Sequence, residues 1–283
     1  MTGKQIRLQR LFNGNLQSGN IVVSAIDHGM FQGVQPGLEN LSSIMAASQR
    51  ADAILMAPGM IAHYAEHFFR RDGPLLISRL AYTSAYCFPW DYREGHTRSM
   101  FSPAYLQSLG ADAIVSSLQL KTGSERIDAE NAEVWGRIVE EKDRLGLPLV
   151  GEFHPAEYEN VPKDEWHELI AAGCRILCEL GADCIKTFYT DERFERIAES
   201  VPVPILVLGS NKLPREIDAL RLAENGIRHG ARGVVFGRNI FMSQSPARII
   251  DALGAIVREG KSADEAALLL KGEGTDEAPY AKR

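Results

Sequence analysis

A lysine inside an apolar run is the side chain of this sequence with the clearest potential for chemistry. Lys186 stands at the centre of Cys-Ile-Lys-Thr-Phe, residues 184–188. A charged group is costly in such surroundings, and burial among apolar neighbours favours the neutral amine, which attacks carbonyl carbons. The run therefore predicts a Schiff-base lysine on an inward-facing strand position. The alternative is a structural lysine that is paired with a carboxylate.

A carboxylate follows the first apolar run of the chain. Asp27 directly follows this run and precedes His28-Gly29. We interpret Asp27 as a group that transfers a proton or orients a carbinolamine, and the alternative is a helix-capping or turn aspartate. His28 is expected to be a packing or hydrogen-bonding residue rather than a metal ligand.

Two more titratable side chains end the fifth apolar run. Glu152 and His154 belong to Gly-Glu-Phe-His-Pro, residues 151–155. Side chains alternate between the two faces of a strand, so these two share one face. Either group can move a proton near neutral pH, and the sequence leaves the choice between them open. For Glu152, a role at the protein surface is the alternative.

Two glycine-containing loops in the last third of the chain are suited to an anion. Loops after the seventh and eighth strands of a barrel commonly cradle a phosphate with backbone amides and a fixed positive charge. The candidate ligands are Gly209, Ser210, Asn211, Gly237 and Arg238. Arg79, at the end of the third run, is expected to bind a second anionic or hydroxylated end of the substrate. Together these residues predict a phosphorylated small molecule as the partner.

Eight short apolar runs rich in Val, Ile and Leu carry these side chains. They are Ile21–Ile26, Ala53–Ala57, Leu75–Ser78, Ala113–Leu118, Pro148–Phe153, Cys184–Phe188, Pro204–Leu208 and Gly233–Phe236. Segments with apolar residues three and four apart separate most of them, as amphipathic helices covering a sheet require. This alternation predicts an α/β protein, a single-domain (β/α)8 TIM barrel, with its active site at the C-terminal ends of the strands. An open doubly wound sheet is the alternative, but the first run leads into Asp27 and not into a glycine-rich nucleotide fingerprint.

A weak internal repeat supports the barrel. A polar residue stands between a small residue and an apolar run at Asp52, Asp112, Asp183 and Arg232. The spacing fits two strand-helix units per repeat, which assigns these positions to the starts of strands two, four, six and eight. Residues 1–272 are expected to form the barrel domain and residues 273–283 a polar tail. Tyr82–Ser102 has no helical period and is predicted to be a long loop after the third strand.

The composition favours a protein whose partner is a small molecule. The chain has 283 residues, 45% of them hydrophobic, and a net charge of −6, which gives no electrostatic footprint for nucleic acid or a membrane surface. The four cysteines lack metal-ligand spacing and are expected to be buried, reduced thiols, and no metal or other cofactor is predicted. The N-terminus has no apolar run typical of a signal peptide, so a cytoplasmic location is expected.

Three segments resemble those of a known enzyme family. They are Ala25–Gly29, Ile185–Thr187 with Tyr189, and Gly237–Phe241, and the likeness extends from Leu8 to about Ala267. The family is the class I, Schiff-base aldolases of the DeoC/FbaB type, which includes archaeal-type fructose-bisphosphate aldolase and the autoinducer-2 phosphate thiolase. The resemblance implies a TIM barrel that catalyses its reaction without a metal.

The resemblance also implies roles for residues of this chain. Lys186 matches the Schiff-base lysine, Asp27 the acid/base aspartate, and Ser210 with Gly237-Arg238 the phosphate loops. The resemblance further implies a ring-based homo-oligomer such as a decamer. We therefore expect reversible aldol cleavage of a phosphorylated ketose. Acyl transfer to coenzyme A from a phosphorylated diketone, and a non-catalytic sugar-phosphate binding protein, remain as alternatives.

Overall fold

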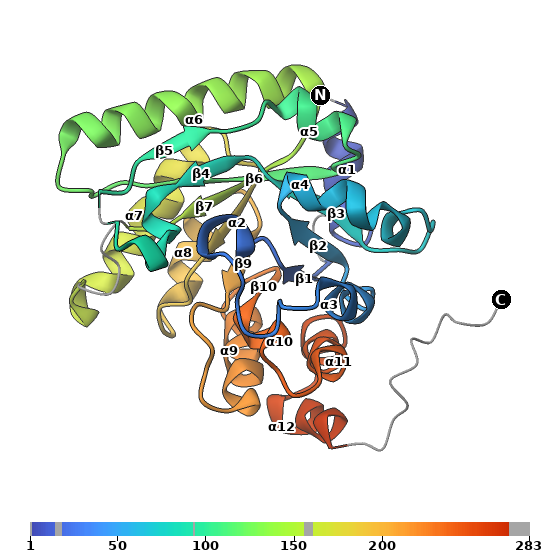
Figure 1. Ribbon diagram of the computed structural model, residues 1–283. Helices are drawn as coiled ribbons and strands as arrows, with labels where there is room; N and C mark the ends of the chain where they lie inside the picture. The colour runs from blue at the N-terminus through green and yellow to red at the C-terminus, as the bar shows by residue number, and fades with distance from the viewer. Residues whose placement is uncertain (1, 15–18, 93, 156–160, 272–283) are drawn as a thin grey trace.

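Eight parallel strands form a closed barrel at the centre of the molecule (Figure 1). The computed structural model describes residues 2–14, 19–92, 94–155 and 161–271. The barrel strands are β1 (Ile21–Ala25), β2 (Ala53–Met56), β3 (Leu75–Arg79), β6 (Ala113–Leu118), β7 (Leu149–Phe153), β8 (Cys184–Thr187), β9 (Ile205–Leu208) and β10 (Gly233–Phe236). Around the barrel they follow the order β1-β10-β9-β8-β7-β6-β3-β2. The predicted (β/α)8 TIM barrel is therefore confirmed, and each predicted run overlaps one barrel strand.

Helices surround the barrel and connect its strands (Figure 1). The α-helices are α1 (Thr2–Leu11), α2 (Gly29–Gln32), α3 (Leu41–Ser48), α4 (Pro58–Ile61), α5 (Pro103–Ser108), α6 (Glu125–Leu145), α7 (Lys163–Glu179), α8 (Phe194–Ser200), α9 (Glu216–Arg228), α10 (Arg238–Phe241), α11 (Pro246–Val257) and α12 (Ala263–Ala266). Short 3-10 helices are η1 (Ala62–Phe68), η2 (Ser84–Tyr86), η3 (Phe88–Trp90) and η5 (Ala267–Leu270). None of the described helices combines the length and the apolar character needed to cross a membrane.

The long helix α6 shows how local sequence sets the ends of an element. The Ser124 side chain accepts a hydrogen bond from the backbone N–H of Ile127, which caps the first turn. At the other end Gly146 adopts a φ of 62°, a left-handed conformation that glycine reaches without steric cost. Trp135 and Ile138 lie buried on the face that covers the barrel.

Two apolar layers fill the molecule. One lies between the strands and the surrounding helices, and the other fills the barrel interior with side chains such as Val23, Leu55 and Val115. Leu11 and Phe12 belong to the interior layer, so α1 and the residue after it close the N-terminal end of the barrel. The interior is thus a packed core at this end, which leaves the opposite end for a site.

The internal repeat of the sequence has a structural basis. The carboxylates of Asp52 and Asp183 accept hydrogen bonds from the backbone N–H groups of Val22 at 2.7 Å and Leu149 at 2.9 Å. Asp112 makes the equivalent bond across another strand pair. Each aspartate therefore joins the start of its own strand to the strand before it. At the fourth repeat Arg232 instead donates to Asn20 and to the Gly19 carbonyl.

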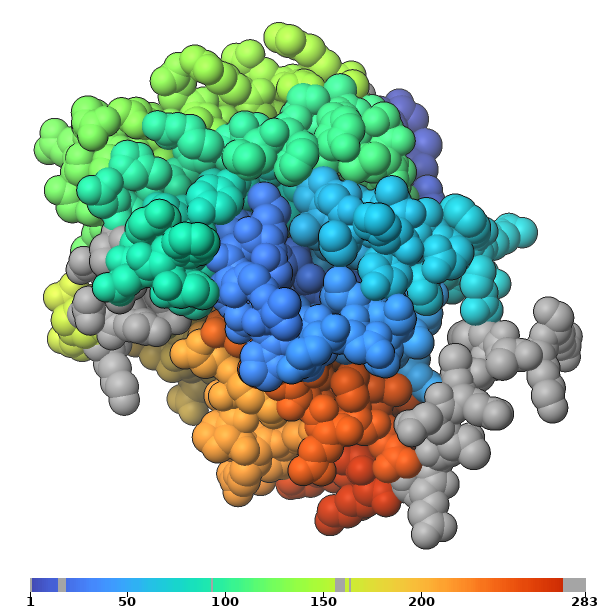
Figure 2. Space-filling model, viewed as in Figure 1, coloured from blue at the N-terminus to red at the C-terminus, as the bar shows by residue number. Residues whose placement is uncertain are grey.

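The segment Tyr82–Ser102 is more ordered than predicted. It contributes to a two-stranded antiparallel sheet of β4 (Ala81–Thr83) and β5 (Thr97–Ser99), with η2 and η3 between the strands. The prediction of a long loop is wrong because three-residue strands are too short to show a period in sequence. Asn131 of α6 holds the hairpin by accepting from the Thr97 N–H and donating to the Gly95 carbonyl. The hairpin lies beside α2 on the face shown in Figure 2.

Two other expectations concern the cysteines and the tail. Cys87, Cys174 and Cys184 are free and buried, as expected, whereas Cys178 is half-buried. The predicted polar tail, residues 273–283, lies outside the described residues.

Candidate active site

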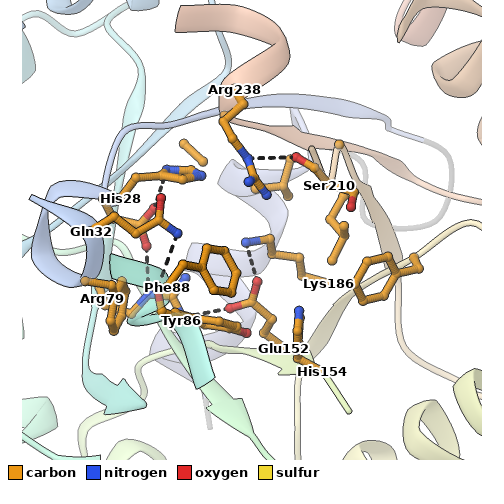
Figure 3. Close-up of a pocket in the computed structure, with 18 residues that line it drawn as sticks. His28, Gln32, Arg79, Tyr86, Phe88, Glu152, His154, Lys186, Ser210 and Arg238 are labelled. Atoms are coloured by element: carbon orange, nitrogen blue, oxygen red, sulfur yellow. Dashed lines mark hydrogen bonds and ion pairs between the residues drawn. The ribbon is translucent and has the colours of Figure 1, made fainter. Parts of the chain in front are cut away.

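A cavity opens at the C-terminal end of the barrel (Figure 3). Segments from β1, β3, β7, β8, β9 and β10 and the residues after them contribute to its wall. The lining residues are Ala25, Asp27, His28, Phe31, Gln32, Arg79, Tyr86, Phe88, Glu152, His154, Lys186, Phe188, Leu208, Gly209, Ser210, Val235, Gly237 and Arg238. The cavity therefore lies at the end of the barrel where the sequence places the chemistry.

Strand alternation explains why charged side chains line this cavity. Cys184 belongs to the interior layer of the barrel, so Lys186, two positions further along β8, also points inward. The same step leads from Val150 to Glu152 on β7. Strand pairing then places Glu152 beside Lys186. The polar residues form the last layer of the barrel interior, directly above the apolar ones.

Four charged residues in this layer form a continuous chain of ion pairs. Lys186 Nζ lies 2.5 Å from Glu152 Oε1, and Arg79 Nη1 lies 2.8 Å from Glu152 Oε2. Arg79 Nε donates at 2.7 Å to Asp27 Oδ2. All four residues are at least 92% buried. The chain holds two positive and two negative groups, so the buried charge is balanced.

The surroundings of Lys186 differ from those expected from sequence. Its neighbours Ile185 and Thr187 point to the opposite face of the strand, so they do not surround the amine. Its amine instead contacts a carboxylate, as the alternative reading of a paired lysine requires. The pair nevertheless lies in the wall of a cavity.

The two carboxylates of the chain remain ionised. Burial alone raises the pKa of Glu152, but the charges of Lys186 and Arg79 outweigh burial and hold this pKa well below its usual range. Burial likewise opposes ionisation of Asp27, and the charge of Arg79, with a smaller contribution from Lys186, keeps its pKa below the usual value. Both groups therefore accept hydrogen bonds at neutral pH.

The two histidines of the cavity are neutral at pH 7. Burial lowers the pKa of His154 to about 4 and that of His28 to about 4. His154 Nδ1 lies 3.0 Å from the Pro155 carbonyl oxygen, which can only accept, so Nδ1 carries the proton and Nε2 is an acceptor. His28 packs edge-on against Phe241, with ring centroids 5.0 Å apart. This contact fits the packing role expected for His28.

Tyr86 and Ser117 are polar members of the site that sequence reasoning missed. The Ser117 hydroxyl oxygen lies 3.1 Å from the Tyr86 hydroxyl and 3.0 Å from Glu152 Oε2. Burial and the nearby Glu152 charge raise the pKa of Tyr86 well above its usual value, so the phenol stays protonated. Alternation along β6 signals that Ser117 faces inward. No local pattern signals Tyr86, because its position depends on how the hairpin segment packs on the barrel.

The predicted anion loops lie together on one side of the cavity. Arg238 Nε donates to the Ser210 carbonyl at 3.1 Å, and the Asn239 side chain donates to the Gly209 carbonyl at 2.8 Å. Gly237 approaches His28 so closely that an added Cβ would lie 2.3 Å from the imidazole Cε1. Of the predicted ligands, Asn211 is exposed and does not line the cavity. The other four do.

Arg79 lines the cavity but lies deeper than predicted. Only 2% of its surface is exposed, and its guanidinium donates to Asp27, Ser117 and Glu152. It therefore has partners inside the barrel and is not turned toward an anion at the rim. Among the described residues, no cluster of three or more His, Cys, Asp or Glu side chains is arranged to hold a metal ion.

The fold and the site define a (β/α)8 barrel with a lysine–carboxylate centre at its C-terminal mouth. Residues 21–243 match the sequence profile of the DeoC/LacD family aldolases, and the chain belongs to this family. The match covers all eight barrel strands and both anion loops.

Relatives across the family resemble the chain over nearly its whole length. An uncharacterized aldolase of Saccharolobus solfataricus is 30% identical over 276 residues, 96% of this chain and 100% of that protein. The 3-hydroxy-5-phosphonooxypentane-2,4-dione thiolase of Yersinia enterocolitica is 31% identical over 265 residues, 93% of this chain and 85% of the thiolase. Similar sequences in this family thus carry two different activity names.

Solved structures show the same fold. An archaeal fructose 1,6-bisphosphate aldolase superimposes with a TM-score of 0.76 at 24% identity. This match covers 90% of the present chain and 98% of the aldolase chain. A Schiff-base-forming fructose-1,6-bisphosphate aldolase, solved with reaction intermediates, gives a TM-score of 0.73 at 25% identity. This match covers 90% of the present chain and 99% of the aldolase chain.

Proposed function

We propose that the protein is a class I aldolase that reversibly cleaves a phosphorylated ketose through an imine on Lys186. The observation that carries this proposal is the Lys186 amine in the cavity wall, 2.5 Å from a buried carboxylate. The family membership and the Schiff-base chemistry named for a structural neighbour support it. No metal is needed, because the iminium itself accepts the electrons of the broken bond.

Imine formation requires the neutral amine. We assign to Glu152, whose Oε1 lies 2.5 Å from Lys186 Nζ, the removal of the ammonium proton, after which the nitrogen attacks the substrate carbonyl carbon. The resulting carbinolamine loses its hydroxyl as water and becomes the iminium. We assign to Glu152 the delivery of a proton to that hydroxyl. Asp27, which accepts a hydrogen bond from Arg79, is assigned the orientation of the carbinolamine.

Carbon–carbon cleavage then needs a base at the substrate hydroxyl. His154 is assigned this role because its pKa of about 4 leaves it neutral and its Nε2 is an acceptor. As the base removes the hydroxyl proton, an aldehyde forms and the bonding electrons move into the iminium, giving an enamine. Protonation of the enamine carbon and hydrolysis of the imine return the free lysine. Arg79 acts here as a positioning residue that fixes both carboxylates.

The substrate phosphate is assigned to the loops after β9 and β10. Gly209, Ser210, Gly237 and Arg238 line that side of the cavity. Binding a phosphate there holds the carbonyl carbon near Lys186, which converts attack into an intramolecular step.

Borohydride trapping tests the proposal. The protein is incubated with dihydroxyacetone phosphate, reduced with borohydride and digested, and mass spectrometry locates the adduct. We expect the reduced adduct on Lys186 and none in Lys186→Met. Steady turnover of a ketose phosphate by Lys186→Met would sink the mechanism.

Thiolase chemistry is the second candidate, because relatives 31% identical to this chain are named thiolases. It predicts that product formation from a phosphorylated diketone requires coenzyme A and yields an acyl thioester. Aldol cleavage proceeds at the same rate with and without coenzyme A. A non-catalytic sugar-phosphate binding protein would bind ligand without forming an imine.

The family resemblance also leads us to propose a ring-based homo-oligomer in the cytoplasm. Mass photometry of the purified protein measures the number of subunits directly.

A further inference from the structure

Ser117 lies behind the chain of ion pairs at the mouth. It stands on β6 and is the register partner of Glu152 on β7, which in turn pairs with Lys186 on β8. Only 3% of the surface of Ser117 is exposed, and it is not among the described residues that line the cavity. Ser117 therefore acts on the site only through the side chains that it contacts.

The Ser117 hydroxyl makes three hydrogen bonds, and the chemistry of its partners sets their directions. Glu152 is ionised and its Oε2, 3.0 Å away, can only accept, so Ser117 donates its single proton there. Arg79 Nη1 can only donate, and it lies 3.1 Å from the Ser117 oxygen. The Tyr86 hydroxyl, also at 3.1 Å, then donates to Ser117 as well. A hydroxyl has one donor and two acceptor positions, so every position of Ser117 is used.

These contacts leave one oxygen of Glu152 open to a proton. Oε2 accepts from Arg79 Nη1 at 2.8 Å and from Ser117 at 3.0 Å, which occupies both of its acceptor positions. Oε1 lies 2.5 Å from Lys186 Nζ (Figure 3). A proton that moves from Lys186 to Glu152 is therefore held on Oε1, beside the nitrogen that released it.

We propose, resting on the aldolase function proposed above, that Ser117 is a positioning residue that directs the proton of Glu152 to Oε1. Oε1 takes this proton from the Lys186 ammonium, and the neutral amine adds to the carbonyl carbon and passes a second proton to the carbonyl oxygen. Oε1 then returns its proton to the carbinolamine hydroxyl, which leaves as water. The iminium carries the positive charge, and Glu152 is again ionised. Without the Ser117 donor, Oε2 competes for the proton on the side that faces Arg79.

Two variants of nearly the same shape test this role. Ser117→Thr keeps the hydroxyl, whereas Ser117→Val puts a methyl group in its place. The rate at which dihydroxyacetone phosphate forms a borohydride-trapped imine on Lys186 is measured over a range of pH. We expect Ser117→Val to react at least about tenfold more slowly, because a hydrogen bond to a charged group is lost. Its acid limb should move to higher pH, because the lost bond favoured the ionised carboxylate. Ser117→Thr should recover the native profile.

Ser116 provides the control on the same strand. Its side chain belongs to the opposite face of β6, and its buried hydroxyl has no hydrogen-bond partner among the described residues. Ser116→Ala should therefore keep the native rate and pH profile. Ser117→Ala takes the place of Ser117→Val if the valine variant does not fold.

NMR of carboxyl-labelled glutamate reads the state of Glu152 without an imine. The signal of Glu152 is identified by its loss in Glu152→Gln. We expect this signal to titrate at higher pH in Ser117→Val than in the native protein, and as in the native protein in Ser117→Thr and Ser116→Ala.

The outcomes separate this role from the aldolase function. Native imine kinetics in Ser117→Val, or equal slowing in Ser117→Val and Ser117→Thr, overturns the role of the hydroxyl while labelling of Lys186 keeps the function. If the native protein forms no imine but the Glu152 signal shifts in Ser117→Val, the function fails and the control of Glu152 by Ser117 stands. An unchanged Glu152 signal in Ser117→Val overturns that control.

Discussion

Buried ion pairs lie at both ends of the barrel, but they face different surroundings. At the C-terminal mouth, Lys186 contacts Glu152 at 2.5 Å, and both side chains line a cavity. At the N-terminal end, Lys142 Nζ contacts Asp183 Oδ2 at 2.6 Å, and that carboxylate also accepts from the Leu149 backbone N–H. Neither Lys142 nor Asp183 lines the cavity of the mouth.

The two ion pairs have different surroundings, and we expect the pair at the N-terminal end to serve stability and the pair at the mouth to serve catalysis. At the N-terminal end the carboxylate is committed to backbone and lysine donors that hold β7, β8 and α6 together. At the mouth the same kind of pair, Lys186 with Glu152, lies beside a cavity, and our proposal assigns catalysis to it. Removing one partner of a buried pair is costly at either end, and under the proposed function it also costs activity at the mouth.

Replacing the lysine at each end gives the largest contrast. We expect Lys186→Met to lower kcat/KM at least about a thousandfold, because the nucleophile is lost. Lys142→Met should keep kcat/KM and lower the free energy of unfolding by about 2 kcal/mol, because Asp183 keeps Lys4 as a partner. Ketose cleavage assays and urea denaturation measure the two effects. Comparable activity in the two variants would show that the mouth is not the catalytic end.

The carboxylates provide the next comparison. Glu152→Gln keeps the shape but removes the proton acceptor of Lys186, and we expect kcat to fall about a hundredfold. Asp183→Asn is the matched variant at the N-terminal end and should leave kcat unchanged. Rates of borohydride labelling show whether the loss in Glu152→Gln arises at imine formation. A normal labelling rate in that variant argues against Glu152 as the acceptor.

The neutral histidines predict an unusual pH dependence at the mouth. With a pKa of about 4, His154 remains a base at pH 5.5, whereas a histidine with a pKa of 6.5 would be about tenfold depleted in its neutral form. We therefore expect the acid limb of kcat/KM near pH 4. An acid limb near pH 6.5 would contradict the assignment of a burial-lowered pKa to His154. The variant His154→Gln tests whether the limb belongs to this residue.

The same shifts determine the sign of the stability change with pH. The unfolded chain binds protons at its histidines below about pH 6.5, while His28 and His154 in the folded protein resist protonation until about pH 4. The free energy of unfolding should therefore decrease as the pH falls from 6.5 to 4. Thermal unfolding at a series of pH values measures this loss.

The smallest expected effect concerns the phenol of Tyr86. Tyr86→Phe keeps the ring but removes the hydroxyl that contacts Ser117, and we expect kcat to fall about fivefold because Glu152 is less well oriented. Tyr82→Phe removes a hydroxyl from the same segment, where the partner is Cys87. It should leave kcat unchanged. Equal losses in both variants would indicate a general effect on the hairpin.

Much of the fold was predictable because the barrel strands are buried on both faces and appear as continuous apolar runs. The aspartate repeat was also readable, since Asp52, Asp112 and Asp183 make the same bond at three strand starts. The β4–β5 hairpin was not, because its short strands depend on Asn131 of α6 for support. Tyr86 was missed for the same reason.

Which residues face the mouth follows from local sequence, because the two-residue period of a strand puts Glu152, His154 and Lys186 on inward positions. Their partners depend on contacts between distant parts of the chain. Strand register pairs Glu152 with Lys186, and closure of the barrel brings Arg79 between Glu152 and Asp27. A local pattern carries no information on contacts between residues that are distant in sequence, and those contacts set the charges, the hydrogen bonds and the walls of this cavity.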